Sequence, residues 1–116
     1  MEIAYKNKPI QTVCEDYKKA ARKYNTLVAD KLHAALNFIQ AAENIRDVAK
    51  YPPFHFHDLK GDRAGCFAMD LGRRLGYRLI VRPNLKGRYA APEEVFGTEA
   101  LEIVVIQLEE VTNHYE

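Results

Sequence analysis

The chain has 116 residues, of which 47% are hydrophobic and 28% are charged, a balance typical of one globular domain rather than a disordered or multi-domain protein. No apolar run approaches the roughly 18 residues that cross a membrane, and the start Met1-Glu2-Ile3 lacks the pattern of a secretory signal, so a cytoplasmic protein without membrane contact is expected. The formal net charge of +1 excludes no class of partner by itself.

The chain is predicted to begin with a strand and a helix. Residues 2–6 alternate apolar and polar side chains, as a half-buried strand does. Thr12 and Glu15 have the spacing of a capping box, in which each side chain satisfies an unpaired amide at the start of a helix. The apolar residues that follow recur at helical spacing, which predicts an amphipathic helix of about three turns.

A second helix is predicted directly after the first. Asn25 or Thr26 can cap it, and its apolar stripe runs towards Ile45 and ends before the pair Pro52-Pro53, which no helix interior accepts. Because the connection between the two helices is short, they are expected to pack as a hairpin.

The period of the pattern changes from 3.6 to 2 after the prolines. Residues 54–59 are predicted to form a short strand that ends at the turn 60–63. Residues 66–71 and 77–82 are predicted to form two more strands, and their connection across 72–76 makes them a hairpin with a basic tip.

The last third of the chain holds a long connection and a final strand. Residues 83–100 show no clear period and are expected to form a lid, an insertion or a mobile loop. The β-branched run 103–106 predicts a strand in a central position of the sheet. The sequence therefore predicts an α+β fold of order β-α-α-β-β-β in a single domain, 1–116, with a mostly antiparallel sheet of three to four strands after the helix hairpin.

Neither the cysteines nor the histidines have the spacing of a metal site. Cys14 and Cys66 lack a second Cys or His at zinc-finger spacing, so both are expected to be buried thiols. His55 and His57 lie two apart on the predicted strand and would project from one face about 7 Å apart, but no third ligand is close in sequence. No metal or other cofactor is expected, and a structural role for at least one of this pair stays open.

The charges are distributed unevenly along the chain. Residues 1–50 hold nine Lys or Arg and six Asp or Glu, residues 51–92 hold eight and three, and residues 93–116 hold none and seven. This asymmetry indicates an anion-binding face, and nucleic acid is a plausible ligand for it. Two solvated faces of opposite charge are the alternative.

Four arginines lie close together in the basic segment. Arg73 and Arg74 fall at the predicted hairpin tip, while Arg78 and Arg82 have the same parity on their strand and therefore extend from one face. Such a row suits contact with phosphates. Metal-free RNA cleavage needs a base for the 2′-hydroxyl proton, an acid for the leaving 5′-oxygen and cations at the phosphorane. The alternative is a solvated face or ion pairs with the acidic segment.

Two other kinds of site have no support. The chain contains no serine, and its glycines form no phosphate-binding loop before a helix, which excludes a serine triad and a Walker motif. Among the aromatic residues, the phenylalanines are expected in the core, while Tyr77, Tyr89 and Tyr115 are better suited to exposed roles because each carries a polar tip.

The runs His57–Leu71 and Gly76–Arg82, together with the order of elements, resemble the RelE/ParE superfamily of type II toxins. They are most similar to its HigB-like branch, the plasmid maintenance killer proteins, over most of the chain outside the loop 83–100. This resemblance implies a ribosome-dependent endoribonuclease that cuts mRNA and is neutralised by a cognate antitoxin protein.

The resemblance also implies roles for individual residues. His57 and Lys60 match the motif's His and Lys and would serve in acid–base work and phosphate binding, while Arg63 and Arg78 match its two arginines and would stabilise the phosphorane. A C-terminal His of the branch takes part in catalysis, and His114 is its candidate here. The residues expected to contact RNA are His55, Arg73, Arg74, Arg82 and Tyr115.

The chain departs from the branch at its end and in its charge. The branch ends with Asp-Tyr-His, where this chain has Asn113-His114-Tyr115, and ribosome-cutting members are more basic. Two alternatives therefore stay open beside the nuclease. One is a non-enzymatic toxin of the ParE kind, which inhibits DNA gyrase and needs no catalytic histidine; the other is an inactive member of the superfamily.

Overall fold

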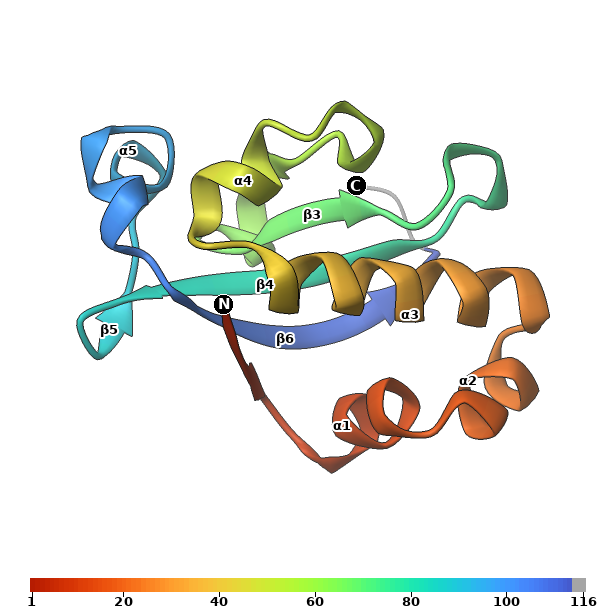
Figure 1. Cartoon of the computed structure of the whole chain (residues 1–116). Helices are drawn as coiled ribbons and strands as arrows, with labels where there is room; N and C mark the ends of the chain where they lie inside the picture. The colour runs from red at the N-terminus through yellow and green to blue at the C-terminus, as the bar shows by residue number, and fades with distance from the viewer. Residues whose placement is uncertain (114–116) are drawn as a thin grey trace.

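The computed structural model describes residues 1–113, which form helices packed against one mixed sheet (Figure 1). The strands are β1 (Glu2–Tyr5), β2 (His57–Asp58), β3 (Phe67–Asp70), β4 (Arg78–Leu85), β5 (Arg88–Tyr89) and β6 (Val105–Thr112). The α-helices are α1 (Lys8–Glu15), α2 (Tyr17–Lys23), α3 (Thr26–Ala41), α4 (Ile45–Ala49) and α5 (Pro92–Val95). Short 3₁₀ turns lie at η1 (Pro52–Phe54), η2 (Gly61–Arg63), η3 (Arg73–Leu75) and η4 (Thr98–Glu102).

The sheet has the order β1-β6-β4-β3-β2, and β5 pairs with the end of β4. Strand β1 runs parallel to β6, and the other pairs are antiparallel. The predicted α+β fold with a mostly antiparallel sheet is confirmed. Because β6 pairs with β1 on one side and β4 on the other, the central position predicted for the final strand is confirmed as well. Its predicted bounds, 103–106, are wrong, because the strand begins at Val105 and continues to Thr112.

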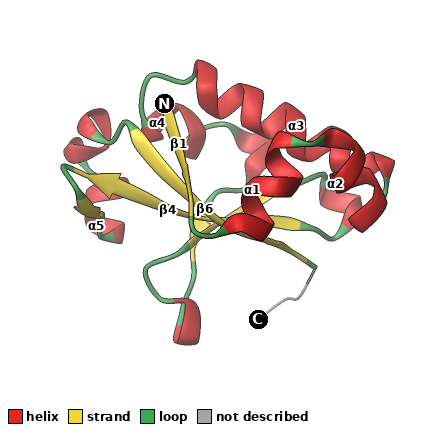
Figure 2. Cartoon of the chain, turned by 90° about the horizontal axis from the view of Figure 1, so that it is seen from below, coloured by secondary structure: helices red, strands yellow, loops and turns green. Residues whose placement is uncertain are grey.

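The two faces of the sheet differ in what covers them. Helix α3 lies across β4 and β6 in Figure 1, and Figure 2 shows α1, α2 and α3 gathered on one side of the sheet. Leu79 and Val81 of β4 point into the main core beneath these helices, which also contains Leu32 of α3. Arg78 and Arg82 have the opposite parity and lie on the other face, which we call the arginine face. A small apolar cluster sits on this face: Leu59, Cys66, Ala68 and Ile80.

The first predicted helix is divided in two. Asn7, not Thr12, caps α1 by accepting a hydrogen bond from the Ile10 amide at 3.2 Å. Asp16 then ends α1 and caps α2, because its carboxylate accepts a hydrogen bond from the Lys19 amide at 3.1 Å. The predicted capping box at Thr12 is therefore wrong. A short polar side chain such as Asp16 competes with the helix for backbone donors, and the chain turns where it does so.

The predicted cap of the second helix is confirmed at Asn25, whose side-chain oxygen accepts a hydrogen bond from the Val28 amide at 2.8 Å. Replacing Asn25 with alanine is expected to lower the free energy of unfolding by about 1 kcal/mol, because that amide then loses its acceptor. Urea denaturation measures this loss. Asn37→Ala is the matched control, since Asn37 is exposed within α3. Equal losses in the two variants would contradict a capping role.

The strand predicted over 54–59 is wrong for most of its length. Pro52 and Pro53 begin the turn η1, and His55 has the left-handed backbone angle φ of 44°. Regular pairing is restricted to β2, where His57 lies opposite Ala68 and Asp58 opposite Phe67. The rings of His55 and His57 still lie close, with 5.0 Å between their centroids, but a turn of the backbone brings them together rather than a shared strand face.

The segment 83–100, expected as an irregular connection, contains ordered elements. Strand β4 continues to Leu85, and Lys86 and Gly87 have φ of 50° and 85°, which is the tight-turn geometry that joins twisted strands. In α5, the Glu94 carboxylate pairs with Arg88 at 2.6 Å and accepts a hydrogen bond from the Ala91 amide. These contacts lower the pKa of Glu94 from 4.5 to about 2, and Arg88 is the main cause. The sequence did not predict this hairpin, because Pro83 has no backbone N–H to donate and a proline usually marks the end of a strand, whereas here it lies within β4.

Both cysteines are free and buried, as predicted. Burial, with a smaller effect of Glu15, raises the pKa of the Cys14 thiol from 9.0 to about 12. At pH 8 its thiolate population is therefore expected to be roughly 1,000-fold below that of an ordinary cysteine. In a Cys66→Ala variant, Cys14 is the only thiol. In the folded protein it should react with a disulfide reagent at less than a hundredth of the rate measured for the same variant unfolded in urea. Equal rates would contradict a buried thiol.

Within residues 1–113, no helix is both long enough and apolar enough to cross a membrane.

Candidate functional site

His57 and Arg78 lie on the same side of the sheet. In the pairing register, His57 is opposite Ala68, and Ala68 is opposite Ile80 of β4. Paired residues of antiparallel strands point to the same face, and Arg78 lies two residues from Ile80. His57 therefore shares the arginine face with Arg78, although the two residues come from β-segments far apart in the sequence.

The hydrogen bond of His57 fixes which ring nitrogen carries the proton. Its Nδ1 lies 2.7 Å from the carbonyl oxygen of His55. A carbonyl oxygen can only accept, so Nδ1 must donate. In the neutral ring, Nε2 then has a lone pair and can take a proton, which is what a general base requires. The His57 residue itself is half-buried.

A carboxylate on the neighbouring strand β3 holds the Arg78 side chain. Its Nε lies 3.7 Å from Oδ1 of Asp70, which is directly opposite it on β3. Arg78, His55 and Arg73 line one cavity of about 190 Å³ together with Asp70 and Tyr77. The structure thus brings together two of the expected catalytic or RNA-binding arginines and one histidine at this end of the arginine face.

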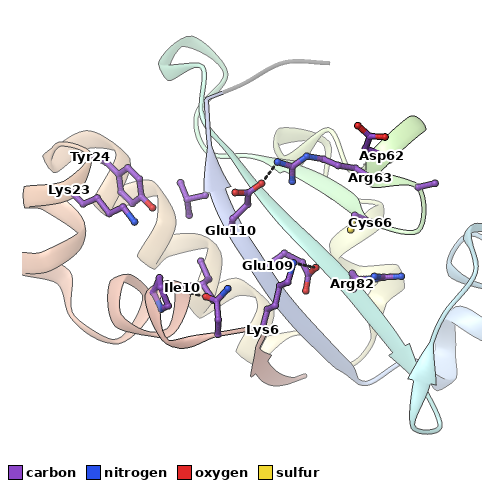
Figure 3. Close-up of a pocket in the computed structure, with 14 residues that line it drawn as sticks. Lys6, Ile10, Lys23, Tyr24, Asp62, Arg63, Cys66, Arg82, Glu109 and Glu110 are labelled. Atoms are coloured by element: carbon purple, nitrogen blue, oxygen red, sulfur yellow. Dashed lines mark hydrogen bonds and ion pairs between the residues drawn. The ribbon is translucent and has the colours of Figure 1, made fainter.

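A second, larger cavity of about 480 Å³ lies where the arginine face, around Arg63 and Arg82, meets α1 and the end of α2 (Figure 3). Its charged lining comes from Lys6, Lys23, Asp62, Arg63, Arg82, Glu109 and Glu110. Arg63 is ion-paired with Glu110. Lys6 Nζ lies 3.7 Å from Oε1 of Glu109, whose other oxygen accepts a hydrogen bond from Gln107 Nε2 at 2.6 Å. Two of the cations that line this cavity are therefore already paired with carboxylates that line it too.

A β-bulge brings both glutamates into this cavity. Ile80 pairs with Glu110, but its neighbour Val81 pairs with Leu108, so Glu109 is an extra residue in β6. Both Glu109 and Glu110 line the cavity, whereas regular alternation would send them to opposite faces. Sequence reasoning missed both residues as parts of the site. The signal available was two consecutive carboxylates in an otherwise apolar strand.

Arg82 is positioned by an aromatic side chain. Its guanidinium carbon lies 3.8 Å from the ring centroid of Tyr89, and the Tyr89 hydroxyl accepts a hydrogen bond from Gln107 at 3.3 Å. Over the described part of the chain, the buried Nε of Arg82 has no hydrogen-bond partner. The Tyr89 ring thus fixes the position of the guanidinium at the edge of the larger cavity, which Arg82 lines.

Lys60 is drawn away from this face. Its Nζ forms an ion pair of 2.8 Å with Asp58, which raises the pKa of Lys60 and lowers that of Asp58. Asp58 is opposite Phe67 and so lies on the side away from His57. Of the other expected residues, Arg74 is exposed on η3, and His114 and Tyr115 lie outside the described residues.

In residues 1–113, no group of three or more His, Cys, Asp or Glu side chains is arranged to hold a metal ion.

No protein-family model and no curated protein matches the chain. Among solved structures, the chain is similar to a YoeB/ParE toxin from Agrobacterium tumefaciens, with a TM-score of 0.52 and 13% sequence identity. The match covers 99% of this chain and 100% of the other. The chain therefore has the fold of a YoeB/ParE-like toxin, in agreement with the fold that its sequence resemblance implied. The narrower HigB-like resemblance stays a prediction.

Proposed function

We propose that the protein is the toxin of a type II toxin–antitoxin system and cleaves mRNA on the ribosome without a metal ion. The observation that carries the proposal is the placement of His57, with Nε2 available, on the same face as Arg78. The toxin-like fold and the sequence motif support it. It would act in the cytoplasm, with a cognate antitoxin protein as its regulator and no cofactor.

The proposed reaction is attack by the 2′-hydroxyl oxygen on the adjacent phosphorus. One group takes the 2′-hydroxyl proton as the phosphorus–oxygen bond forms, and a second gives a proton to the 5′-oxygen as its bond breaks. His57 performs one of these transfers, and His114 is the candidate for the other. Arg78 stabilises the charge on the pentacoordinate phosphorane, and Arg63 is the candidate for a second guanidinium there, because its partner Glu110 lies opposite Ile80, two residues from Arg78. The products are a 2′,3′-cyclic phosphate and a 5′-hydroxyl.

The remaining arginines would hold the RNA on either side of the scissile bond. Arg78 and Arg82 lie four residues apart on β4, which is roughly 13 Å along a strand. This span exceeds one phosphodiester group, so Arg82 would contact a neighbouring phosphate. Arg73, Arg74 and His55 would do so at the opposite end, where the η3 turn is exposed.

Induced expression in bacteria tests the proposal. Primer extension on total mRNA should show new 5′ ends within translated regions soon after induction, and growth should stop. His57→Ala should abolish both effects. Arg22→Ala is the control, since Arg22 is exposed on α2 and lines neither cavity of the arginine face. Intact mRNA during growth arrest, or full activity of His57→Ala, would contradict the proposal.

A gyrase-inhibiting toxin of the ParE kind is the second candidate. The observation in its favour is that three of the five expected catalytic residues are already ion-paired: Lys60 with Asp58, Arg63 with Glu110 and Arg78 with Asp70. Its signature would be a DNA damage response with intact mRNA, unaffected by His57→Ala. Expression without any growth defect would instead indicate an inactive toxin.

A further inference from the structure

The Arg63–Glu110 ion pair lies within the larger cavity of the arginine face, where an anionic ligand would be expected to bind (Figure 3). The Arg63 side chain is 31% exposed and that of Glu110 is 43% exposed. Ion pairs this open to water contribute little to folding stability, so this pair can open without unfolding the protein. Arg63 can therefore exchange its carboxylate partner for another anion.

The neighbouring glutamate makes this arrangement rigid. Glu109 is 7% exposed and is held by Lys6 and by Gln107. Because Glu109 occupies the bulge of β6, it fixes the backbone from which Glu110 points towards Arg63. The carboxylate of Glu110 thus occupies the place beside Arg63 that a phosphate oxygen would take, since a guanidinium presents the same donors to both.

We propose that Glu110 is a built-in competitor of RNA for Arg63. This inference rests on the proposed function, because RNA is the ligand for which Glu110 competes. While Arg63 is paired with Glu110, its guanidinium neutralises no phosphate of the RNA, and the negative charge of Glu110 repels the RNA backbone. The protein therefore binds RNA less tightly than it would without this carboxylate, because a phosphate must first displace Glu110 from Arg63.

The test measures binding separately from cleavage. The probe is a fluorescein-labelled twelve-nucleotide 2′-O-methyl oligouridylate, which lacks the 2′-hydroxyl and cannot be cut by the proposed reaction. Fluorescence anisotropy gives its affinity at several salt concentrations. The logarithm of the association constant falls linearly with the logarithm of the salt concentration, and each additional neutralised phosphate of a single strand steepens that slope by about 0.7. A tenfold decrease in salt, from 1 M to 100 mM, then strengthens binding by about fivefold more than in the wild-type protein. Glu110→Gln is expected to show both changes.

Two further variants separate competition from a general charge effect. Glu102→Gln removes the same charge at the exposed Lys86 pair, whose atoms lie 3.1 Å apart, and is expected to change affinity less than twofold. Arg63→Gln should weaken binding more in the Glu110→Gln background than in the wild-type protein. Equal gains from Glu110→Gln and Glu102→Gln, or no gain from either, would overturn the inference. If the wild-type protein cleaves RNA but Glu110→Gln binds the probe no more tightly, the role of Glu110 is wrong and the proposed nuclease activity stands. If Glu110→Gln binds more tightly but the wild-type protein cleaves no RNA, the nuclease activity is wrong and the role of Glu110 stands.

Discussion

Arg78→Ala is expected to slow RNA cleavage by about 100- to 1,000-fold, the usual loss when one preorganised donor to a developing charge is removed. Arg78 lies on the same face as His57, and Asp70 holds its guanidinium from the opposite strand. Because the phosphorane carries more charge on its oxygens than the substrate does, the loss should appear in the rate of cleavage more than in binding of the RNA. Single-turnover cleavage of mRNA on programmed ribosomes measures it.

Arg78→Lys is the informative companion variant. Lysine keeps the positive charge beside Asp70 but lacks the planar fork, so it should restore stability more fully than cleavage. Thermal unfolding of both variants checks that the protein is folded. A cleavage rate in Arg78→Ala within about threefold of the wild type would contradict a role for this guanidinium in the reaction.

Phe67→Ala is expected to have the largest effect on stability, with a loss of about 3–5 kcal/mol in the free energy of unfolding. Phe67 is completely buried, and its ring stacks on Phe56 with 5.2 Å between centroids. The ring of Phe96, at 5.8 Å, covers it from the segment after α5. Removal of Phe67 therefore leaves a cavity between the sheet and this segment.

Urea denaturation of Phe67→Ala measures the loss, and Phe96→Ala is the matched control. Phe96 belongs to the same cluster but is 53% exposed, so its removal should cost much less. Equal losses in the two variants would contradict a core role specific to Phe67 and would indicate that the cluster stabilises the protein as one unit.

The features that local pattern determines could be predicted from the sequence. The succession of helices and strands along the chain followed from changes in apolar period, and the cap at Asn25 or Thr26 followed from residue type and position. The common face of Arg78 and Arg82 followed from their parity, because a continuous strand alternates its side chains.

The features that depend on contacts distant in sequence could not be predicted. The left-handed turn at His55 is a conformation that non-glycine residues adopt only rarely, and the extra residue Glu109 is defined only by the pairing of β6 with β4. The pairing of Lys60 with Asp58, on the side away from His57, depends on where β2 meets β3. A motif identifies the residue types of a site, but the sheet register decides which of their side chains meet.

The chemistry of the cut ends tests the central claim, that an imidazole and guanidinium groups on one sheet face promote attack by the 2′-hydroxyl. Purified protein is incubated with ribosomes carrying a defined mRNA, and the fragments are examined for their terminal groups. The account predicts 5′-hydroxyl and 2′,3′-cyclic phosphate ends, and no cleavage when the scissile nucleotide carries a 2′-O-methyl group. Fragments with 5′-phosphate ends, or cleavage of the 2′-O-methyl mRNA at the same position, would contradict it.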